Sequence, residues 1–198
     1  MKIVFATGNE GKVREVREML DGMGIELVSL SDYAHVPEIV EDGKSFLENA
    51  LKKAKIISEF TGETVLADDS GLQVDALGGE PGIYSARYAG ESATDEENNT
   101  ALLTKLKNIS QEKRTAFFCC VLVLYRADGR YDYFEGKWKG QIINERRGNN
   151  GFGYDPIFFV PELKKTAAEL PSEIKNKVSH RGHAFAQFKK ALAEKLLN

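Results

Sequence analysis

The sequence predicts an α/β protein with two lobes and a cleft between them. Short apolar strands alternate with amphipathic helices in the first half, which is typical of βαβ units. A long strand–turn–strand pattern follows around Asp128-Gly129, a strong hairpin signal. The 198 residues are enough for one large domain or two small lobes. No repeat or flexible linker interrupts them, so we expect a single domain over 1–198 without a separable linker.

The first half begins with an expected buried strand, KIVFA at 2–6. The helix after it places five apolar residues on one face: Val13, Val16, Met19, Leu20 and Met23. A second strand is expected at 25–30. Ser45 and Glu48 form a capping-box pattern that begins a helix reaching about Phe60. TVLAD at 64–68 is a further expected strand, with Asp68, Asp69 and Ser70 at its C-terminal end.

In the second half, residues 71–90 are too rich in glycine to predict regular structure. Thr94 and Glu97 form a second capping-box pattern, for a helix to about Lys107. Long strands are expected at 114–126 and 130–143. A glycine-rich loop at 149–156 and a last helix at about 183–197 complete the prediction.

The composition excludes several classes of protein. The formal net charge is −3, from 27 basic and 30 acidic residues, so no basic face for nucleic acid is indicated. No run approaches a membrane helix, and MKIVFATG is too quickly polar for a signal peptide. Cys119 and Cys120 lie together in an apolar strand, which favours core thiols over a metal site. These features favour a reduced, cytoplasmic compartment.

The first candidate site is TGNEGK at 7–12, where a strand turns into a helix. Its glycine spacing fits neither a Walker loop nor a Rossmann fingerprint. What remains is a helix N-terminus with the side chains of Thr7, Asn9 and Lys12, a combination suited to a phosphate. An ordinary strand-to-helix turn is the alternative.

The second candidate is ADDSG at 67–71. Adjacent carboxylates stay ionised only beside a cation or hydrogen-bond donors, and in a phosphate site that cation would be Mg²⁺. The same letters also suit a solvated turn. The acidic loop with Glu38, Glu41 and Asp42 could supply a further metal ligand if it folds over the site.

The third candidate is GFGYDP at 151–156, where Phe152 and Tyr154 offer flat faces for a purine, although local packing is the commoner use of such rings.

The fourth candidate is KNKVSHRGH at 175–183. Its two histidines lie three apart, but zinc would need further ligands nearby. Donors to an anion or a carbonyl-rich base are the better interpretation: Lys175, Lys177, His180 and Arg181.

Together these stretches resemble one family, the inosine/xanthosine triphosphate pyrophosphatases, which remove non-canonical purine nucleotides. TGNEGK resembles the family's T/S-G-N-x-x-K motif. Glu41 before SFLENA, then ADDSGL, GGEPGIYSARYAG, GFGYDPIF and SHRG follow in the family's order. The resemblance covers about Lys2 to Leu197. It implies an elongated α/β fold with two lobes around a central substrate cleft, in a protein that is usually a homodimer.

The resemblance also implies roles for individual residues. Glu41 and Asp69 would bind Mg²⁺, with Glu38 as the alternative to Glu41, and Asp69 would orient or deprotonate the attacking water. The implied triphosphate ligands are Thr7, Gly8, Asn9, Glu10, Gly11, Lys12 and Lys53. Ser70 would contact the substrate beside Asp69. The implied base pocket consists of Phe152, Gly153, Tyr154, Asp155, Lys175, His180 and Arg181.

The implied reaction is hydrolysis of ITP, dITP or XTP to the monophosphate and pyrophosphate, by water attack at the α-phosphorus. Donors aimed at O6 would accept a 6-oxo purine and reject a 6-amino one. Two alternatives stay open. A related pyrophosphatase could prefer another nucleotide, and a nucleotide-sensing module would bind without turnover. The acidic residues Asp68, Asp69 and Glu41 argue against the sensing module.

Overall fold

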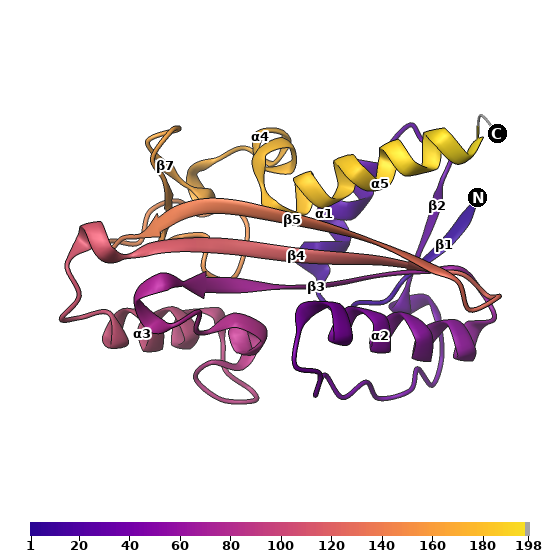
Figure 1. The fold of residues 1–198 in the computed structure, drawn as a ribbon, viewed down its shortest axis with the longest axis horizontal. Coiled ribbons are helices and arrows are strands. Elements are labelled where there is room, and N and C mark those ends of the chain that lie inside the picture. The colour runs from indigo at the N-terminus through magenta and orange to yellow at the C-terminus, as the bar shows by residue number, and fades with distance from the viewer. Residues whose placement is uncertain (197–198) are drawn as a thin grey trace. The chain divides into compact units, whose positions relative to one another are not determined.

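The computed structural model describes residues 1–196, and its elements alternate as an α/β protein (Figure 1). The strands are β1 (Lys2–Phe5), β2 (Glu26–Ser29), β3 (Val65–Val74), β4 (Thr115–Tyr125), β5 (Tyr131–Ile142), β6 (Phe158–Val160) and β7 (Lys165–Thr166). The helices are α1 (Glu10–Leu20), α2 (Phe46–Thr61), α3 (Asp95–Lys105), α4 (Ser172–Val178) and α5 (His180–Leu196).

The sheet is mixed. Within residues 1–196 it contains seven strands, in the order β2-β1-β3-β4-β5-β6-β7. β1 pairs in parallel with both β2 and β3, whereas β6 pairs antiparallel with β5 and β7. The βαβ start and the mixed α/β class predicted from the sequence are therefore confirmed.

The chain folds into two compact units. Unit 1 comprises Met1–Asp69, Cys120–Gly136 and the chain from Arg181 onward, and unit 2 comprises Ser70–Cys119 and Lys137–His180. Three strands (β3, β4 and β5) and helix α5 each begin in one unit and continue into the other. Each unit has its own hydrophobic core.

Unit 1 is layered because side chains alternate across its strands. Ile3 and Phe5 of β1 pack in one core with α1 and α5, while Val4 and Ala6 pack in another with α2. Figure 1 shows α2 on one side of these strands and α1 and α5 on the other. Since both faces are covered, the three residues of β1 after Lys2 are apolar and buried, as expected of a buried parallel strand.

Unit 2 has an aromatic core. The ring centroid of Phe158 lies 4.5 Å from that of Phe118 and 5.2 Å from that of Trp138. His180 stacks on Phe118 with the ring centroids 4.8 Å apart and the planes 13° from parallel. The position of the His180 ring is therefore fixed by stacking on Phe118 as well as by the backbone at the start of α5.

The two helix starts predicted from capping-box patterns are confirmed. Ser45 caps α2 by accepting a hydrogen bond from Glu48 N at 3.1 Å. The reciprocal half of that capping box is absent, because the Glu48 carboxylate accepts from Lys44 N instead. Thr94 and Glu97 form both halves of the box that begins α3. Each cap satisfies N–H groups that the first turn of a helix leaves unpaired.

Three boundaries differ from the prediction. β3 does not end at Asp68 but continues to Val74, so the two aspartates lie inside a strand. The glycine-rich segment 71–90 thus begins as strand and then contains 3₁₀ turns at Asp75–Leu77 and Gly82–Arg87. The last helix begins at His180 rather than 183. Its predicted final residue, Leu197, lies outside the described residues.

The two cysteines are free and buried, as predicted. Burial raises the pKa of the Cys120 thiol to about 12, which keeps it protonated and unreactive. Among the described residues, no helix has the length and apolar character needed to span a membrane.

Candidate active site

The loop before α1 in unit 1 is organised by its own side chains. Asn9 is the N-cap of α1, and its side chain accepts a hydrogen bond from Lys12 N at 3.0 Å. Thr7 Oγ1 accepts from Asn9 N at 3.2 Å. Gly8 has open space around its Cα, and Glu10 and Gly11 form the first turn of the helix. The predicted phosphate loop is therefore a capped helix N-terminus, which favours an anion.

Asp68 of β3 is the buried centre of the unit 1 charges. Its side chain is 0% exposed, and its Oδ2 lies 2.9 Å from Arg181 Nη2 and 3.2 Å from Lys12 Nζ. Burial raises the pKa of Asp68, but the positive charges of Lys12 and Arg181 lower it by more. The pKa of this carboxyl therefore lies well below its usual range. The carboxylate is therefore a permanent negative charge among cations.

Asp69, the next residue, lies in different surroundings. Asn49 Nδ2 of α2 donates to Asp69 Oδ2 at 3.0 Å. Burial raises the pKa of Asp69 above its usual value, and the attractions of Lys53 and Lys12 do not cancel that effect. The negative charge of Glu41 raises it further. A carboxylate with a raised pKa is a stronger proton acceptor than an ordinary aspartate.

An ion pair joins Glu41 of the acidic loop to Lys53 of α2. Lys53 is buried, and Glu41 is half-buried, whereas Glu38 is exposed. Glu41, not Glu38, is the loop carboxylate that acts on the pKa of Asp69. Burial and charge therefore favour Glu41 over Glu38 as the partner of Asp69.

The donor set suits a magnesium ion that is shared with a substrate. Within residues 1–196, no three His, Cys, Asp or Glu side chains gather as a ready-made metal site, and this includes His180 and His183. Mg²⁺ is commonly held by one or two carboxylates together with phosphate oxygens and water. Glu41 and Asp69 are two oxygen donors whose charges interact, and they fit that mode.

Unit 2 holds the loop predicted for the base. Lys175 Nζ of α4 lies 2.5 Å from Asp155 Oδ2, and both side chains are almost fully buried. The same oxygen accepts a hydrogen bond from Phe152 N at 3.0 Å, and Lys175 Nζ lies 4.9 Å from the centroid of the Phe152 ring. Asp155 thus fixes the positions of Lys175 and Phe152 together.

Other predicted base residues are more deeply embedded. Tyr154 is 4% exposed, packs in the unit 2 core and donates its hydroxyl hydrogen to Ser85 O at 2.8 Å. Gly153 N donates to Asp95 Oδ2 at 2.6 Å, and Asn99 Nδ2 donates to Gly153 O at 2.9 Å. A direct contact of Tyr154 with the base stays a prediction, because its known partners are protein groups.

The structure groups the predicted residues within each unit. Unit 1 brings together the α1 N-terminus, Lys53, Glu41, Asp69 and Arg181. Unit 2 contains Ser70 on β3, the 152–155 loop, Lys175 and His180. Arg181 donates to Asp68 and Glu15, so its predicted contact with the base edge also stays a prediction.

Two contributors were missed by the sequence reasoning. Glu15 accepts from Arg181 Nη1 at 2.5 Å, and Asn49 holds Asp69. Glu15 had a sequence signal, because it lies four residues before Met19 and three after Lys12, at the edge of the apolar face of α1. Asn49 lies in SFLENA, one of the stretches that resemble the family, but no local spacing indicated its contact with Asp69, which lies 20 positions away on β3.

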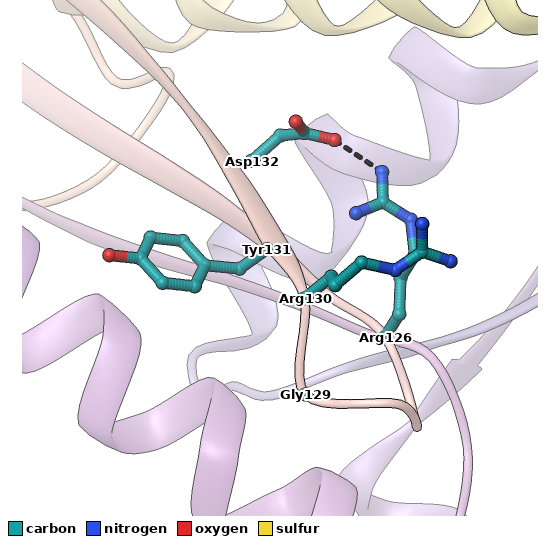
Figure 2. A pocket seen from close by; sticks show the side chains of 5 residues that line it. All are labelled: Arg126, Gly129, Arg130, Tyr131 and Asp132. Atoms are coloured by element: carbon teal, nitrogen blue, oxygen red, sulfur yellow. Dashed lines mark hydrogen bonds and ion pairs between the residues drawn. The ribbon is translucent and has the colours of Figure 1, made fainter.

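The turn between β4 and β5 carries a pocket of about 570 Å³ (Figure 2). It is lined by Arg126, Gly129, Arg130, Tyr131 and Asp132. Figure 2 shows Arg126 paired with Asp132 and the Tyr131 ring pointing away from both arginines. Arg130 Nη2 lies 2.6 Å from Asp128 Oδ2. The lining of this pocket includes no predicted site residue, so we assign the pocket no part in the site.

Known proteins resemble this chain along nearly its whole length. A dITP/XTP pyrophosphatase from Geobacter sulfurreducens is 53% identical over 188 residues, which cover 95% of this chain and 94% of that protein. One from Vibrio vulnificus is 50% identical and covers 99% of this chain and 98% of its own length.

Solved structures agree with these relatives. A HAM1 protein from Coxiella burnetii has a TM-score of 0.89 and 42% identity, and it covers 98% of this chain and 99% of its own. The Ham1 protein from Staphylococcus aureus has a TM-score of 0.87 and 41% identity, covering 98% of this chain and 100% of its own. A family model described as the Ham1 family matches residues 3–191. This chain therefore belongs to the Ham1 family.

Proposed function

We propose that this protein hydrolyses the non-canonical purine nucleoside triphosphates ITP, dITP and XTP to the monophosphate and pyrophosphate, with Mg²⁺, and so removes deaminated purines from the nucleotide pool. The relatives named dITP/XTP pyrophosphatase support the reaction. The observation that carries it in this chain is Asp69, a buried carboxylate with a raised pKa among two lysines and a second carboxylate.

Asp69 accepts the proton of the attacking water. Its raised pKa makes it a better base than an exposed aspartate, and Asn49 fixes one of its oxygens. Attack of that water at the α-phosphorus breaks the bond to the β-phosphate oxygen and releases pyrophosphate.

The phosphates are bound by positive groups of unit 1. The capped N-terminus of α1 offers backbone N–H groups, and Lys12 and Lys53 offer point charges. Glu41 and Asp69 would hold the Mg²⁺ ion, which would neutralise charge on the phosphate oxygens and the leaving group. These groups stabilise charge that builds up as pyrophosphate leaves.

The base is recognised by the residues predicted in unit 2. Lys175 and His180 are donors in fixed positions, through Asp155 and through the Phe118 ring. A donor facing O6 of a 6-oxo purine makes a hydrogen bond, whereas a 6-amino group would bring two donors together. Such a mismatch is a strong basis for discrimination.

A substrate panel tests the proposal. The purified protein is incubated with ITP, dITP, XTP, ATP, GTP and a pyrimidine triphosphate, with Mg²⁺ or with EDTA, and the products are separated. We expect pyrophosphate and monophosphate from the first three, at least about 100-fold faster than from ATP, and loss of turnover in EDTA. Release of orthophosphate would contradict the proposed reaction, and tight ITP binding without turnover would favour a sensing module.

We further propose that the whole chain forms one catalytic domain and assembles as a cytoplasmic homodimer. The family resemblance supports the dimer, and the two free buried thiols agree with a reduced compartment. Light scattering coupled to size-exclusion chromatography measures the mass, and we expect twice the 22.0 kDa of one chain. A mass of one chain at micromolar concentration would contradict the dimer.

A further inference from the structure

A buried chain of ion pairs joins Glu15 of α1 to Lys12 of the same helix. Arg181 Nη1 donates to Glu15 Oε2 at 2.5 Å, and Arg181 Nη2 and Nε donate to Asp68 Oδ2 at 2.9 and 3.2 Å. Lys12 Nζ lies 3.2 Å from that same Asp68 oxygen. The Arg181 and Asp68 side chains are 1% and 0% exposed, so these contacts are shielded from water.

We propose that Glu15 is a positioning residue that sets the place of Lys12 for an anionic ligand, acting through Arg181 and Asp68. This inference rests on the proposed function, since Lys12 is taken to bind the triphosphate. In this proposal Glu15 acts through its ion pair with Arg181 and not by contact with the ligand. Its effect is on where the Lys12 ammonium lies.

The planar guanidinium explains how this works. Glu15 occupies Nη1, which leaves the Nε–Nη2 edge turned toward Asp68. Asp68 Oδ2 thereby receives two fixed donors as well as the Lys12 ammonium. If Arg181 loses its anchor, those donors are less well placed. The flexible Lys12 side chain then becomes the main partner of a buried carboxylate and is drawn away from the ligand.

A purely electrostatic role for Glu15 predicts the opposite result. Glu15 is a negative charge on the helix that begins at the anion site, so removing that charge alone should strengthen binding of an anion. A purely structural role predicts lower thermal stability with unchanged affinity in the folded protein. The three roles therefore differ in the sign of the affinity change.

The test compares Glu15→Gln with Glu18→Gln. Both remove one carboxylate charge from α1, but Glu18 is exposed whereas Glu15 is buried against Arg181. Measured quantities are KM and kcat for dITP with Mg²⁺, the Kd of inorganic pyrophosphate by calorimetry, and Tm. We expect Glu15→Gln to raise KM and Kd about tenfold, the lower range for losing a group that orients a ligand, with little change in kcat. Glu18→Gln should change neither.

A double variant shows whether Glu15 acts through Lys12. Lys12→Ala should weaken pyrophosphate binding by itself, and adding Glu15→Gln should then weaken it no further. Unchanged or tighter binding in Glu15→Gln, or an additive loss in the double variant, would overturn the proposal. If Glu15→Gln does not fold, Glu15→Asp replaces it, because the shorter side chain withdraws the carboxylate from Nη1, and the same rise in Kd is required.

Failure of the inference can be told apart from failure of the proposed function. A wild-type protein that does not hydrolyse dITP or XTP would contradict the function, while its pyrophosphate affinity would still compare the Glu15 variants. A wild-type protein that hydrolyses them, together with a Glu15→Gln variant of normal KM and Kd, would contradict the inference alone.

Discussion

Asp68 and Asp69 are adjacent in the chain, but their surroundings give them different properties. Burial raises both pKa values; the lysine and arginine around Asp68 reverse that effect, and the lysines near Asp69 do not. Two carboxylates whose pKa values are pushed apart are typical of a fixed charge beside a proton acceptor. We therefore expect substitutions at the two positions to fail in different ways.

Asp69→Asn should remove activity and leave the fold intact. The amide keeps the shape of the side chain and can still accept from Asn49, but it cannot take a proton from water. We expect ITP turnover to fall at least about 100-fold, the lower range for losing an acid–base group. Turnover and thermal melting of the variant measure the two effects. Near-normal turnover would remove Asp69 from the mechanism and bring Asp68 forward as the base.

Asp68→Asn should mainly lower stability. Without the negative charge, the buried Arg181 loses its main counter-ion, and Lys12 loses its partner. We expect a loss of about 2–3 kcal/mol, as for hydrogen bonds to charged groups, or about 4–12 °C in Tm. Asp128→Asn in the exposed β4–β5 turn is the matched control and should leave Tm unchanged. Equal melting of the two variants would contradict a stabilising role for Asp68.

At the residue scale, the site residues that belong to local motifs could be predicted from the sequence. Their partners far along the chain could not. The helix N-terminus after TGNEGK was predicted from neighbouring residues, and the structure adds that Asn9 caps it through a contact with Lys12 N, three residues on. The partner of Glu15 lies 166 positions away, and the partner of Asp69 lies 20 positions away on another element. Neither pairing leaves a local pattern that periodicity or spacing could reveal.

At the element scale, the starts of α2 and α3 were predictable because each has its own cap, whereas the end of β3 was not. ADDSG has the composition of a turn, so a strand end was expected there. Tertiary contacts override that preference, because Lys12, Arg181 and Asn49 pair with the carboxylates and make them tolerable inside a buried strand. α5 begins early for a similar reason, since His180 and Arg181 are held by Phe118 and Asp68.

The loop at 149–156 yields a prediction about its glycines. Gly151 has φ of +75°, and a Cβ there would lie 2.0 Å from Asp155 Oδ2. That oxygen cannot move freely, because it holds both Lys175 Nζ and Phe152 N. Gly151→Ala must therefore break the buried Asp155–Lys175 pair or shift the loop. We expect Tm to fall by more than about 6 °C, as for a broken buried ion pair.

Gly153→Ala is the matched control for Gly151→Ala. Its φ of +62° carries a similar backbone strain, but a Cβ there meets nothing within 4 Å. We expect only the cost of that strain, about 1 kcal/mol or about 2–4 °C in Tm. Differential scanning calorimetry of both variants measures the difference. Equal losses would mean that backbone strain, and not the Asp155–Lys175 pair, accounts for the glycine at 151.

At the scale of the whole molecule, the two units are joined by continuous elements rather than by a linker. β3 passes from unit 1 to unit 2 at Asp69–Ser70, and α5 passes back at His180–Arg181. A strand or helix that unfolds in one unit removes hydrogen-bonding partners at the start of the other. This continuity is the physical reason to expect cooperative unfolding of both units, as one domain.

Pyrophosphate with Mg²⁺ provides the test, since its proposed ligands lie in unit 1 while Trp138, the single tryptophan, lies in the unit 2 core. A ligand at 100 times its Kd adds about 2.7 kcal/mol, or about 5–11 °C in Tm for a chain of this size. If the units unfold together, Trp138 fluorescence and far-UV circular dichroism should show the same single transition with the same upward shift. A shifted dichroism transition with an unshifted Trp138 transition would mean that the units unfold separately, and the single-domain proposal would fail.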